Sequence, residues 1–210
     1  MKVFKYNLKL RSNDLNIVRD FVARSDFSFH NLSKIIMTCL NWTGEKQITY
    51  FIESSKIEIT DSRIEIPKTM GINFKSDRDS ICENFLDKGS KFVMIYGDET
   101  PFVFDIEVVD VIYDYEKDAE LLNSIGKEPV ESCEGEREYM EIVSILNNPD
   151  DSKYDETIEW IGKDYLNNIL SIESINENFE NLDLILDEEN EVEDMSDDSE
   201  YSFDIFSDLM

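Results

Sequence analysis

Apolar and polar residues alternate along several short stretches in the first half of the chain, a pattern typical of strands that bury one face. The pattern recurs at residues 3–10, 16–23, 47–54, 56–60, 63–67, 91–96 and 102–112. The stretches 47–54 and 56–60 follow each other so closely that a tight connection is predicted. The Gly97-Asp98 pair predicts a hairpin turn between the last two stretches.

Apolar residues at helical spacing predict a helix after the second strand. They are Leu32, Ile35, Ile36, Cys39 and Leu40. Ser28 stands where a residue could cap the first turn. A shorter helix is predicted within residues 77–89, with Asp79 or Ser80 as its cap and Gly89 as its stop.

The second half of the chain favours helices. Residues 114–125 predict one or two helical turns, and residues 169–179 predict a last helix. Between them, two apolar stripes separated by Pro149-Asp150 predict a pair of helices. The first stripe is Tyr139, Ile142, Val143 and Leu146, and the second is Tyr154, Ile158 and Ile161. Trp42 and Trp160 are expected in or near the core.

The order of these elements, strands first and helices later, predicts an α+β fold. We expect an antiparallel sheet with packed helices, a helical C-terminal part and an acidic tail. Residues 1–180 would form the α+β domain and residues 181–210 the tail. Composition alone predicts that the chain is disordered beyond about residue 182.

Charge narrows the classes of partner. The chain has 210 residues and a net charge of −28, which argues against direct binding to nucleic acid or to anionic membranes. It fits a very soluble protein, a partner with a basic surface, or a mimic of nucleic acid. The last basic residue is Lys163, and residues 164–210 carry a net charge of −16. A block of like charge usually marks a solvated interaction tail.

The sequence offers little catalytic chemistry. Cys39, Cys82 and Cys133 lie too far apart for metal-ligand spacing, and Cys39 falls on the apolar helical stripe, where a core thiol is expected. The single histidine, His30, is expected to be a surface or capping residue. We therefore predict no catalytic, cofactor-binding or metal-binding residue. With no signal peptide and no membrane span, a cytoplasmic protein is expected.

Four stretches give the chain a resemblance to a known family, over roughly residues 3–180. They are CLNWTG, ICENFLDKG, YGDETPFVFDI, and CEGEREYMEIVSILNNPDD followed by EWIG. The residues that match are Trp42, Gly97, Asp98, Tyr139, Pro149, Trp160 and Gly162. On these motifs the chain resembles the Ri-plasmid ORF-three-like family of the pRiA4b type, often labelled as TnpR-like passenger proteins of mobile elements. The resemblance implies the fold.

The chain departs from the family pattern at its polar positions. The family has a His-x-His arrangement after its Trp, where this chain has Lys46 and Ile48. After the Gly-Asp turn the family has Trp and then His, where this chain has Thr100 and Phe102. The family loop Cys-Pro-Pro-Glu-Asp-Cys-Gly-Gly is absent. Any chemistry or metal binding that those positions support in the family is not expected here.

The end of the chain, DDSEYSFDIFSDLM, mixes carboxylates with large apolar residues. The candidate partner-binding residues are Phe203, Ile205, Phe206, Leu209 and Met210. On a helix, four of them would share one face, which is typical of acidic segments that fold into a groove on a partner. Two alternatives remain open: the last turn docks on the chain's own domain, or it mediates self-association.

Three functions follow, in order of preference. The first is a non-enzymatic adaptor or regulatory module that binds a basic protein through its acidic surface and tail. The second is an inhibitor that mimics nucleic acid and blocks a basic DNA- or RNA-binding protein. The third is an enzyme of unknown type, which we consider less favoured because no catalytic constellation is visible.

Overall fold

The computed structural model describes residues 1–61, 73–163, 165, 171–182 and 186. In chain order the elements are β1 (Val3–Leu10), β2 (Val18–Arg24), α1 (Phe29–Leu40), β3 (Ile48–Ile52), β4 (Ile57–Thr60), β5 (Asn73–Ser76), the 3-10 turn η1 (Cys82–Asn84), β6 (Lys91–Tyr96), β7 (Phe102–Ile112), β8 (Ala119–Ile125), α2 (Gly135–Leu146), α3 (Tyr154–Ile161) and α5 (Ile172–Phe179). This succession confirms the α+β class, with strands in the first part and helices in the second.

The described strands form one sheet in the order β5-β4-β3-β6-β7-β1-β2-β8. Most neighbouring pairs are antiparallel, as expected. The exception is β4 and β5, which run parallel, so the sheet is mixed. The predicted hairpin is confirmed, because β6 and β7 pair from Lys91 to Tyr96 around the turn at Gly97. The strand expected at residues 63–67 lies outside the described residues.

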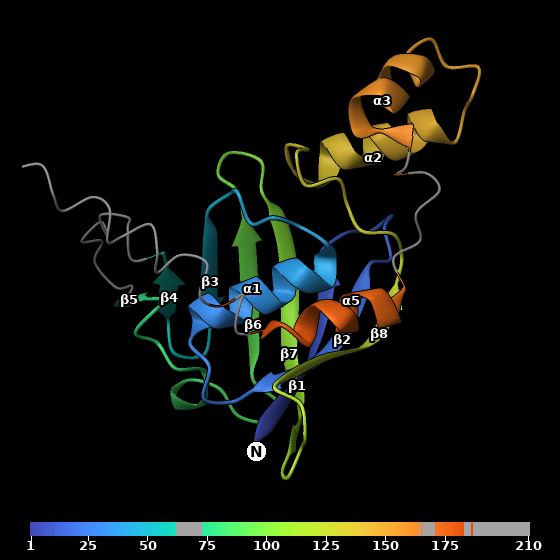
Figure 1. Ribbon diagram of the computed structural model, residues 1–210. Coiled ribbons are helices and arrows are strands. Elements are labelled where there is room, and N and C mark those ends of the chain that lie inside the picture. The colour runs from blue at the N-terminus through green and yellow to red at the C-terminus, as the bar shows by residue number, and fades with distance from the viewer. Residues whose placement is uncertain (62–72, 164, 166–170, 183–185, 187–210) are drawn as a thin grey trace, which may run out of the picture.

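One face of the sheet is apolar and is covered by α1 and α5 (Figure 1). Because side chains alternate along a strand, Phe4, Tyr6 and Leu8 of β1 are buried on this face, whereas Lys9 on the opposite face is exposed. The rings of Tyr6 and Phe21 stack at 5.1 Å across β1 and β2. The alternation read from the sequence therefore defines which side of the sheet forms the core.

Helix α1 has the boundaries that its sequence predicts. The Ser28 hydroxyl accepts a hydrogen bond from the backbone N–H of Asn31 at 3.2 Å, which confirms the predicted cap. The helix ends where Asn41 adopts a left-handed conformation with φ 55°. Cys39 is buried, as expected of a core thiol. The buried Arg19 side chain donates to the Cys39 carbonyl at 3.0 Å, which places a cation at the negative end of the helix.

The helix expected within residues 77–89 is wrong, because only the single turn η1 forms. The backbone of this segment is committed to another partner: the N–H of Cys82 donates to the Phe27 carbonyl at 2.8 Å. Ile81 also forms an isolated antiparallel bridge with Ser28, so the chain runs extended beside the start of α1 up to this turn. The residue before η1 is Ile81, so neither predicted cap is used.

The helical turns expected within residues 114–125 are also wrong, since this stretch contains β8. Ala119 and Leu121 point into the core and pair with Ala23 and Phe21 of β2. Pairing with an existing strand overrides the local pattern here. β8 is an edge strand, and α5 closes part of that edge.

Helices α2 and α3 pack on each other and project beyond the end of the sheet (Figure 1); we call them the α2–α3 lobe. Tyr139 and Ile142 of the first predicted stripe are buried. The expectation that Trp160 lies in or near the core is wrong, because it is 51% exposed. None of the helices in the described part of the chain is long and apolar enough to cross a membrane.

Candidate functional site

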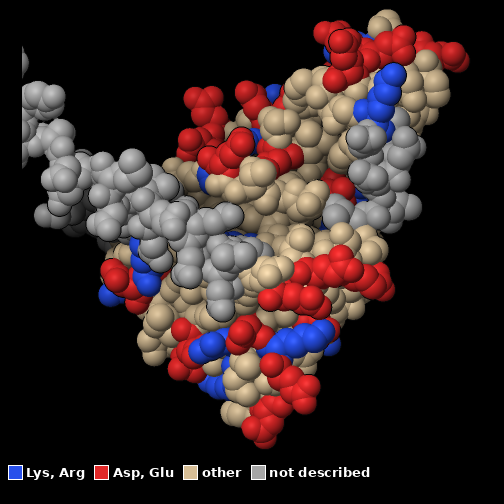
Figure 2. Space-filling model, viewed as in Figure 1, with Lys and Arg blue, Asp and Glu red and all other residues tan. Residues whose placement is uncertain are grey.

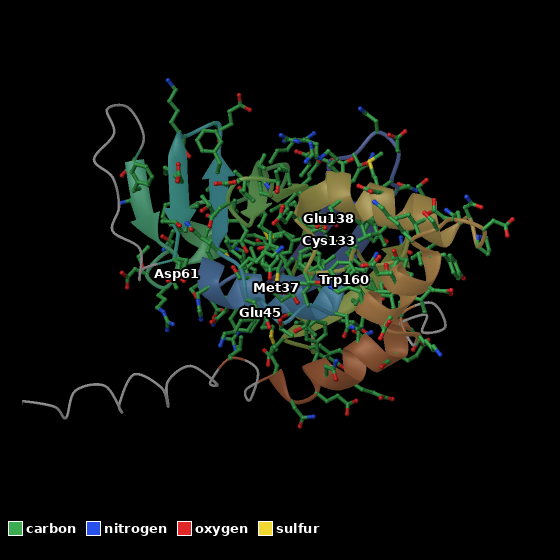
Figure 3. All side chains as sticks on the ribbon, turned by 90° about the horizontal axis from the view of Figure 1, so that it is seen from above. Met37, Glu45, Asp61, Cys133, Glu138 and Trp160 are labelled. Carbon is green, nitrogen blue, oxygen red and sulfur yellow. The ribbon has the colours of Figure 1, made fainter. Side chains whose placement is uncertain are left out.

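Three segments meet at the end of the sheet from which the α2–α3 lobe projects. They are the α1–β3 loop, the β6–β7 turn and the segment 126–135, which connects β8 to α2. Figure 3 labels Cys133 and Glu138 where this segment enters α2, with Glu45 of the α1–β3 loop nearby. The side chains that meet there are Trp42, Thr43, Lys46, Tyr96, Glu131 and Cys133, which we call the Glu131 cluster.

The Glu131 carboxylate is held by donors from the α1–β3 loop. It accepts hydrogen bonds from the backbone N–H of Thr43 at 2.7 Å and of Gly44 at 2.8 Å, from the Thr43 hydroxyl at 3.0 Å, and from the Tyr96 hydroxyl. Burial alone would raise the pKa of Glu131. The hydrogen bonds outweigh burial, so the pKa lies below its ordinary value and the side chain is an anion.

Aromatic rings form the floor of the cluster. Trp42 stacks on Tyr96 with ring centroids 4.7 Å apart and contacts Phe102 at 5.2 Å. Its indole N–H donates to the Pro129 carbonyl at 2.7 Å. Trp42 therefore lies in the core, as expected, and at the same time fastens the segment 126–135 to the sheet.

The remaining groups of the cluster are also engaged. The Lys46 ammonium donates to the Cys133 carbonyl at 2.5 Å, and burial raises the pKa of the Cys133 thiol to about 12. A Cβ added at Gly135 would lie 2.1 Å from the Thr100 carbonyl oxygen, so only glycine fits that contact. Lys46, one of the positions that depart from the family pattern, thus holds the segment 126–135 in place, and the Thr100 backbone packs directly against it.

The cluster as folded offers binding groups and no free nucleophile. Its acid is an anion saturated with donors, its thiol is protonated, and its lysine faces a carbonyl. The Thr43 and Tyr96 hydroxyls do lie within hydrogen-bond reach of the Glu131 carboxylate. The pKa of that carboxyl lies below its ordinary value and burial raises the pKa of Tyr96, so the carboxylate is a poor base for activating either hydroxyl. These contacts fasten the segment 126–135 to the α1–β3 loop and so position the α2–α3 lobe relative to the sheet.

The other candidate side chains lie apart from the cluster. His30 sits in the first turn of α1, with its ring Nδ1 3.2 Å from the Asp77 carboxylate. Burial raises the pKa of the Cys82 thiol to about 12, and it also raises that of Cys39. Across the part of the chain that the structure describes, no group of three His, Cys, Asp or Glu side chains is arranged to hold a metal ion.

No sequence pattern singles out Glu131, which is one of 48 acidic residues. Its role depends on the fold, which brings it to backbone donors at Thr43 and Gly44, almost ninety positions earlier. One local signal existed: Gly44, with φ 82°, forms a turn of the kind in which successive backbone N–H groups can bind an anion. That signal predicts where a carboxylate could bind, but it does not predict which residue supplies the carboxylate.

The α2–α3 lobe carries an acidic surface. Residues 134–163 contain nine Asp and Glu against three Lys and Arg, a net charge of −6. Figure 2 shows carboxylates over the lobe and again along α5. Trp160 is half exposed on this acidic surface. The predicted partner-binding residues Phe203, Ile205, Phe206, Leu209 and Met210 lie outside the described residues, as does most of the predicted tail.

Comparisons with known proteins agree with this fold. A crystal structure of MM3350, a protein of unknown function from Methanosarcina mazei Go1, superposes with a TM-score of 0.68 at 14% sequence identity, over 82% of this chain and 96% of that one. At that identity the likeness shows the fold alone. No curated protein matches the sequence. The family model described as plasmid pRiA4b ORF-3-like protein matches residues 2–174, and the chain therefore belongs to that family.

Proposed function

We propose that this protein is a non-enzymatic interaction module, an adaptor or regulator, that binds a partner with a basic surface through its acidic α2–α3 lobe and its C-terminal tail. The observation that carries the proposal is the half-exposed Trp160 on an acidic, projecting lobe. Tryptophan is enriched among the residues that dominate binding energy at protein interfaces. With half of its surface exposed on a lobe that projects from the sheet, Trp160 is accessible to a partner.

Charge around Trp160 defines the partner. The first turn of α3 carries Asp155 and Glu156, and Glu159 precedes the tryptophan. A surface of one sign attracts a partner of the opposite sign and accelerates encounter, while the aromatic side chain supplies affinity once contact is made. The tail adds carboxylates and further aromatic residues. Both elements fit a basic protein segment that presents apolar side chains.

The test is capture of partners from host lysate with tagged full-length protein and two variants. One variant is Trp160→Ala, and the other replaces Phe203, Phe206 and Leu209 with serine. Tyr113→Ala is the matched control, because Tyr113 is 69% exposed but lies away from the lobe. A protein that the wild type and Tyr113→Ala retain, and that the other two variants lose at moderate salt, is the expected result. Equal capture by all four baits contradicts the proposal.

The same experiment separates the nucleic-acid-mimic function. A mimic binds through charge, so its partner is lost when salt is raised and is released by added duplex DNA. Replacing Trp160 with alanine would then change partner binding little, because the tryptophan side chain is neutral. Release by DNA with full binding to Trp160→Ala would replace the adaptor proposal with the mimic.

A further inference from the structure

The face of the sheet opposite α1 and α5 carries a groove of about 380 Å³ across β1, β3, β6 and β7. It continues into a second hollow of about 570 Å³ beside the β6 end of the sheet, with which it shares Glu53 and Lys91. We call the two together the sheet-face groove. Figures 1 and 3 place α1 and α5 on the other side of the sheet.

The groove combines an apolar floor with charged walls, in which three cations stand beside the carboxylates of Glu53, Asp105 and Glu107. Phe51 and Val93 are directly opposed across β3 and β6, and both are only partly buried. Lys9, Arg11 and Lys91 stand around them. Apolar side chains and cations together are unusual on a chain with a net charge of −28.

Two of the three carboxylates that line the groove are paired with its cations. Asp105 pairs with Arg11, and Glu107 lies 3.2 Å from the Lys91 ammonium. Lys9 is exposed and has no ion-pair partner among the described residues. Exposed ion pairs of this kind contribute little to the stability of the fold, so their partners can be exchanged at little cost. An additional carboxylate can therefore pair with these cations, and the charges involved stay in contact with solvent.

We propose that residues 187–210 of the same chain bind in the sheet-face groove, with their aromatic residues on Phe51 and Val93 and their carboxylates beside Lys9 and Lys91. This segment has eleven Asp and Glu and no Lys or Arg. Its aromatic residues match the apolar floor of the groove, and its carboxylates can pair with the exposed Lys9 and Lys91. The lobe and α5, being acidic, repel it.

The segment is long enough to reach the groove. The last described residue, Leu186, is tied to α1 on the other side of the sheet, where its carbonyl accepts from Lys34 at 3.2 Å. Twenty-four further residues span up to roughly 80 Å when extended. Packed layers are separated by about 10 Å, so the path around the sheet edge uses only part of that length.

Tethering favours this occupant over a second copy or a foreign peptide. Because the groove and residues 187–210 belong to one chain, binding is intramolecular and has an effective concentration of about a millimolar. Contacts too weak to hold a separate molecule therefore suffice within one chain. The inference rests on the proposed function, since the tail is one of its two recognition elements, and it adds that docking in the groove competes with binding of the partner.

A spin label on the tail tests the contact in the full-length protein. Cys39, Cys82 and Cys133 are all buried, so a Ser202→Cys variant takes a nitroxide at the introduced thiol. We expect selective broadening of the backbone amide signals of Phe51, Lys91 and Val93, with little effect on α2 and α3. Broadening centred on the helices, or none at all, overturns the proposal.

Charge reversals in the labelled protein make the test specific. Lys91→Glu should weaken broadening at Val93 by roughly threefold, and Lys9→Glu combined with Lys91→Glu by roughly tenfold. Lys153→Glu is the matched control, because Lys153 is also an exposed lysine with one carboxylate partner, Glu141, but lies at the lobe. Equal loss in the control variant contradicts docking in the groove.

A mixed sample distinguishes docking within one chain from docking on a second copy. It contains isotope-labelled protein without the nitroxide and spin-labelled protein without the isotopes. Broadening in that mixture means that the tail reaches a second copy, and it overturns docking within one chain. These readouts need no partner, so their failure leaves the capture experiment intact. Failure of that capture experiment likewise leaves the spin-label result standing.

Discussion

At the scale of single residues, Glu131 links the sheet to the α2–α3 lobe. Its carboxylate receives three backbone donors from the α1–β3 loop and two hydroxyl donors, from Thr43 and Tyr96. Hydrogen bonds to an ionised acceptor are stronger than those between neutral groups. A residue that sequence reasoning would treat as one more surface acid therefore contributes to the rigidity of the joint.

Replacing Glu131 with glutamine should lower the free energy of unfolding by about 1–3 kcal/mol, because an amide accepts at one oxygen only and leaves backbone donors poorly paired. Urea denaturation measures the change. Glu159→Gln, on the exposed side of α3, is the control and should stay within about 0.5 kcal/mol of the wild type. Equal urea midpoints for both variants would contradict a stabilising role for the Glu131 carboxylate.

The stability that Glu131 contributes should depend on pH in a defined direction. Because its folded pKa lies below the ordinary value of 4.5, the contribution is complete above that value and is lost as the pH falls through the folded pKa. The difference between wild type and Glu131→Gln should therefore shrink as the pH is lowered from about 6 to about 3. Urea midpoints across that range measure it, and a constant difference would disagree with the shifted pKa.

Gly135 offers a steric test at the same joint. Its φ is +77°, and a Cβ would lie 2.1 Å from the Thr100 carbonyl oxygen. Gly89 also has positive φ, +86°, but has open space around it. Alanine at Gly89 should cost about 1–2 kcal/mol for its backbone conformation alone. Alanine at Gly135 should cost clearly more, as measured by thermal or urea unfolding, and equal costs would contradict the close contact.

At the scale of elements, α5 closes the edge of the sheet with one side chain. The Asn176 amide accepts from the N–H of Leu121 at 2.7 Å and donates to the carbonyl of the same residue at 3.0 Å, as a neighbouring strand would. Beyond that point Leu122 and Ile125 of β8 are 37% and 42% exposed. Uncovered strand edges with apolar residues invite pairing between chains.

Asn176→Ala should therefore have two effects. Stability should fall by about 1–2 kcal/mol as the Leu121 N–H and carbonyl lose their partners. Self-association at high protein concentration should rise, which sedimentation velocity measures. Asn178→Ala, on an exposed part of the same helix, should do neither. If Asn176→Ala stays monomeric with unchanged stability, the amide is not what protects the edge.

The same elements show which parts of the fold could be predicted from the sequence. Alternation in residues 3–10 and the helical stripe ending at Leu40 determined β1 and α1, because each element buries one face against the other. β8 was mistaken for helix because its identity comes from pairing with β2, a contact that no local pattern contains. The Glu131 cluster was invisible for the same reason: its donors and acceptor are distant in the chain.

At the scale of the whole molecule, the net charge of −28 sets two electrostatic effects against each other. Ion pairs such as Lys91–Glu107 and Lys153–Glu141 are exposed and contribute about 0–1 kcal/mol each, which salt removes. Repulsion among the excess carboxylates destabilises the folded state over longer distances, and salt relieves it. With more than twice as many acids as bases, repulsion should dominate.

Added sodium chloride should therefore raise the urea midpoint near neutral pH, most steeply below about 0.1 M, where the Debye length shortens to about 10 Å. Potassium sulfate at equal ionic strength is the control, because screening depends on ionic strength whereas exclusion of sulfate from the protein surface keeps stabilising at higher concentration. Matching curves at low ionic strength would confirm screening. A midpoint that falls with salt would mean that the ion pairs on the open sheet face outweigh the repulsion, and the cations of the sheet-face groove would then be too firmly paired to receive the tail.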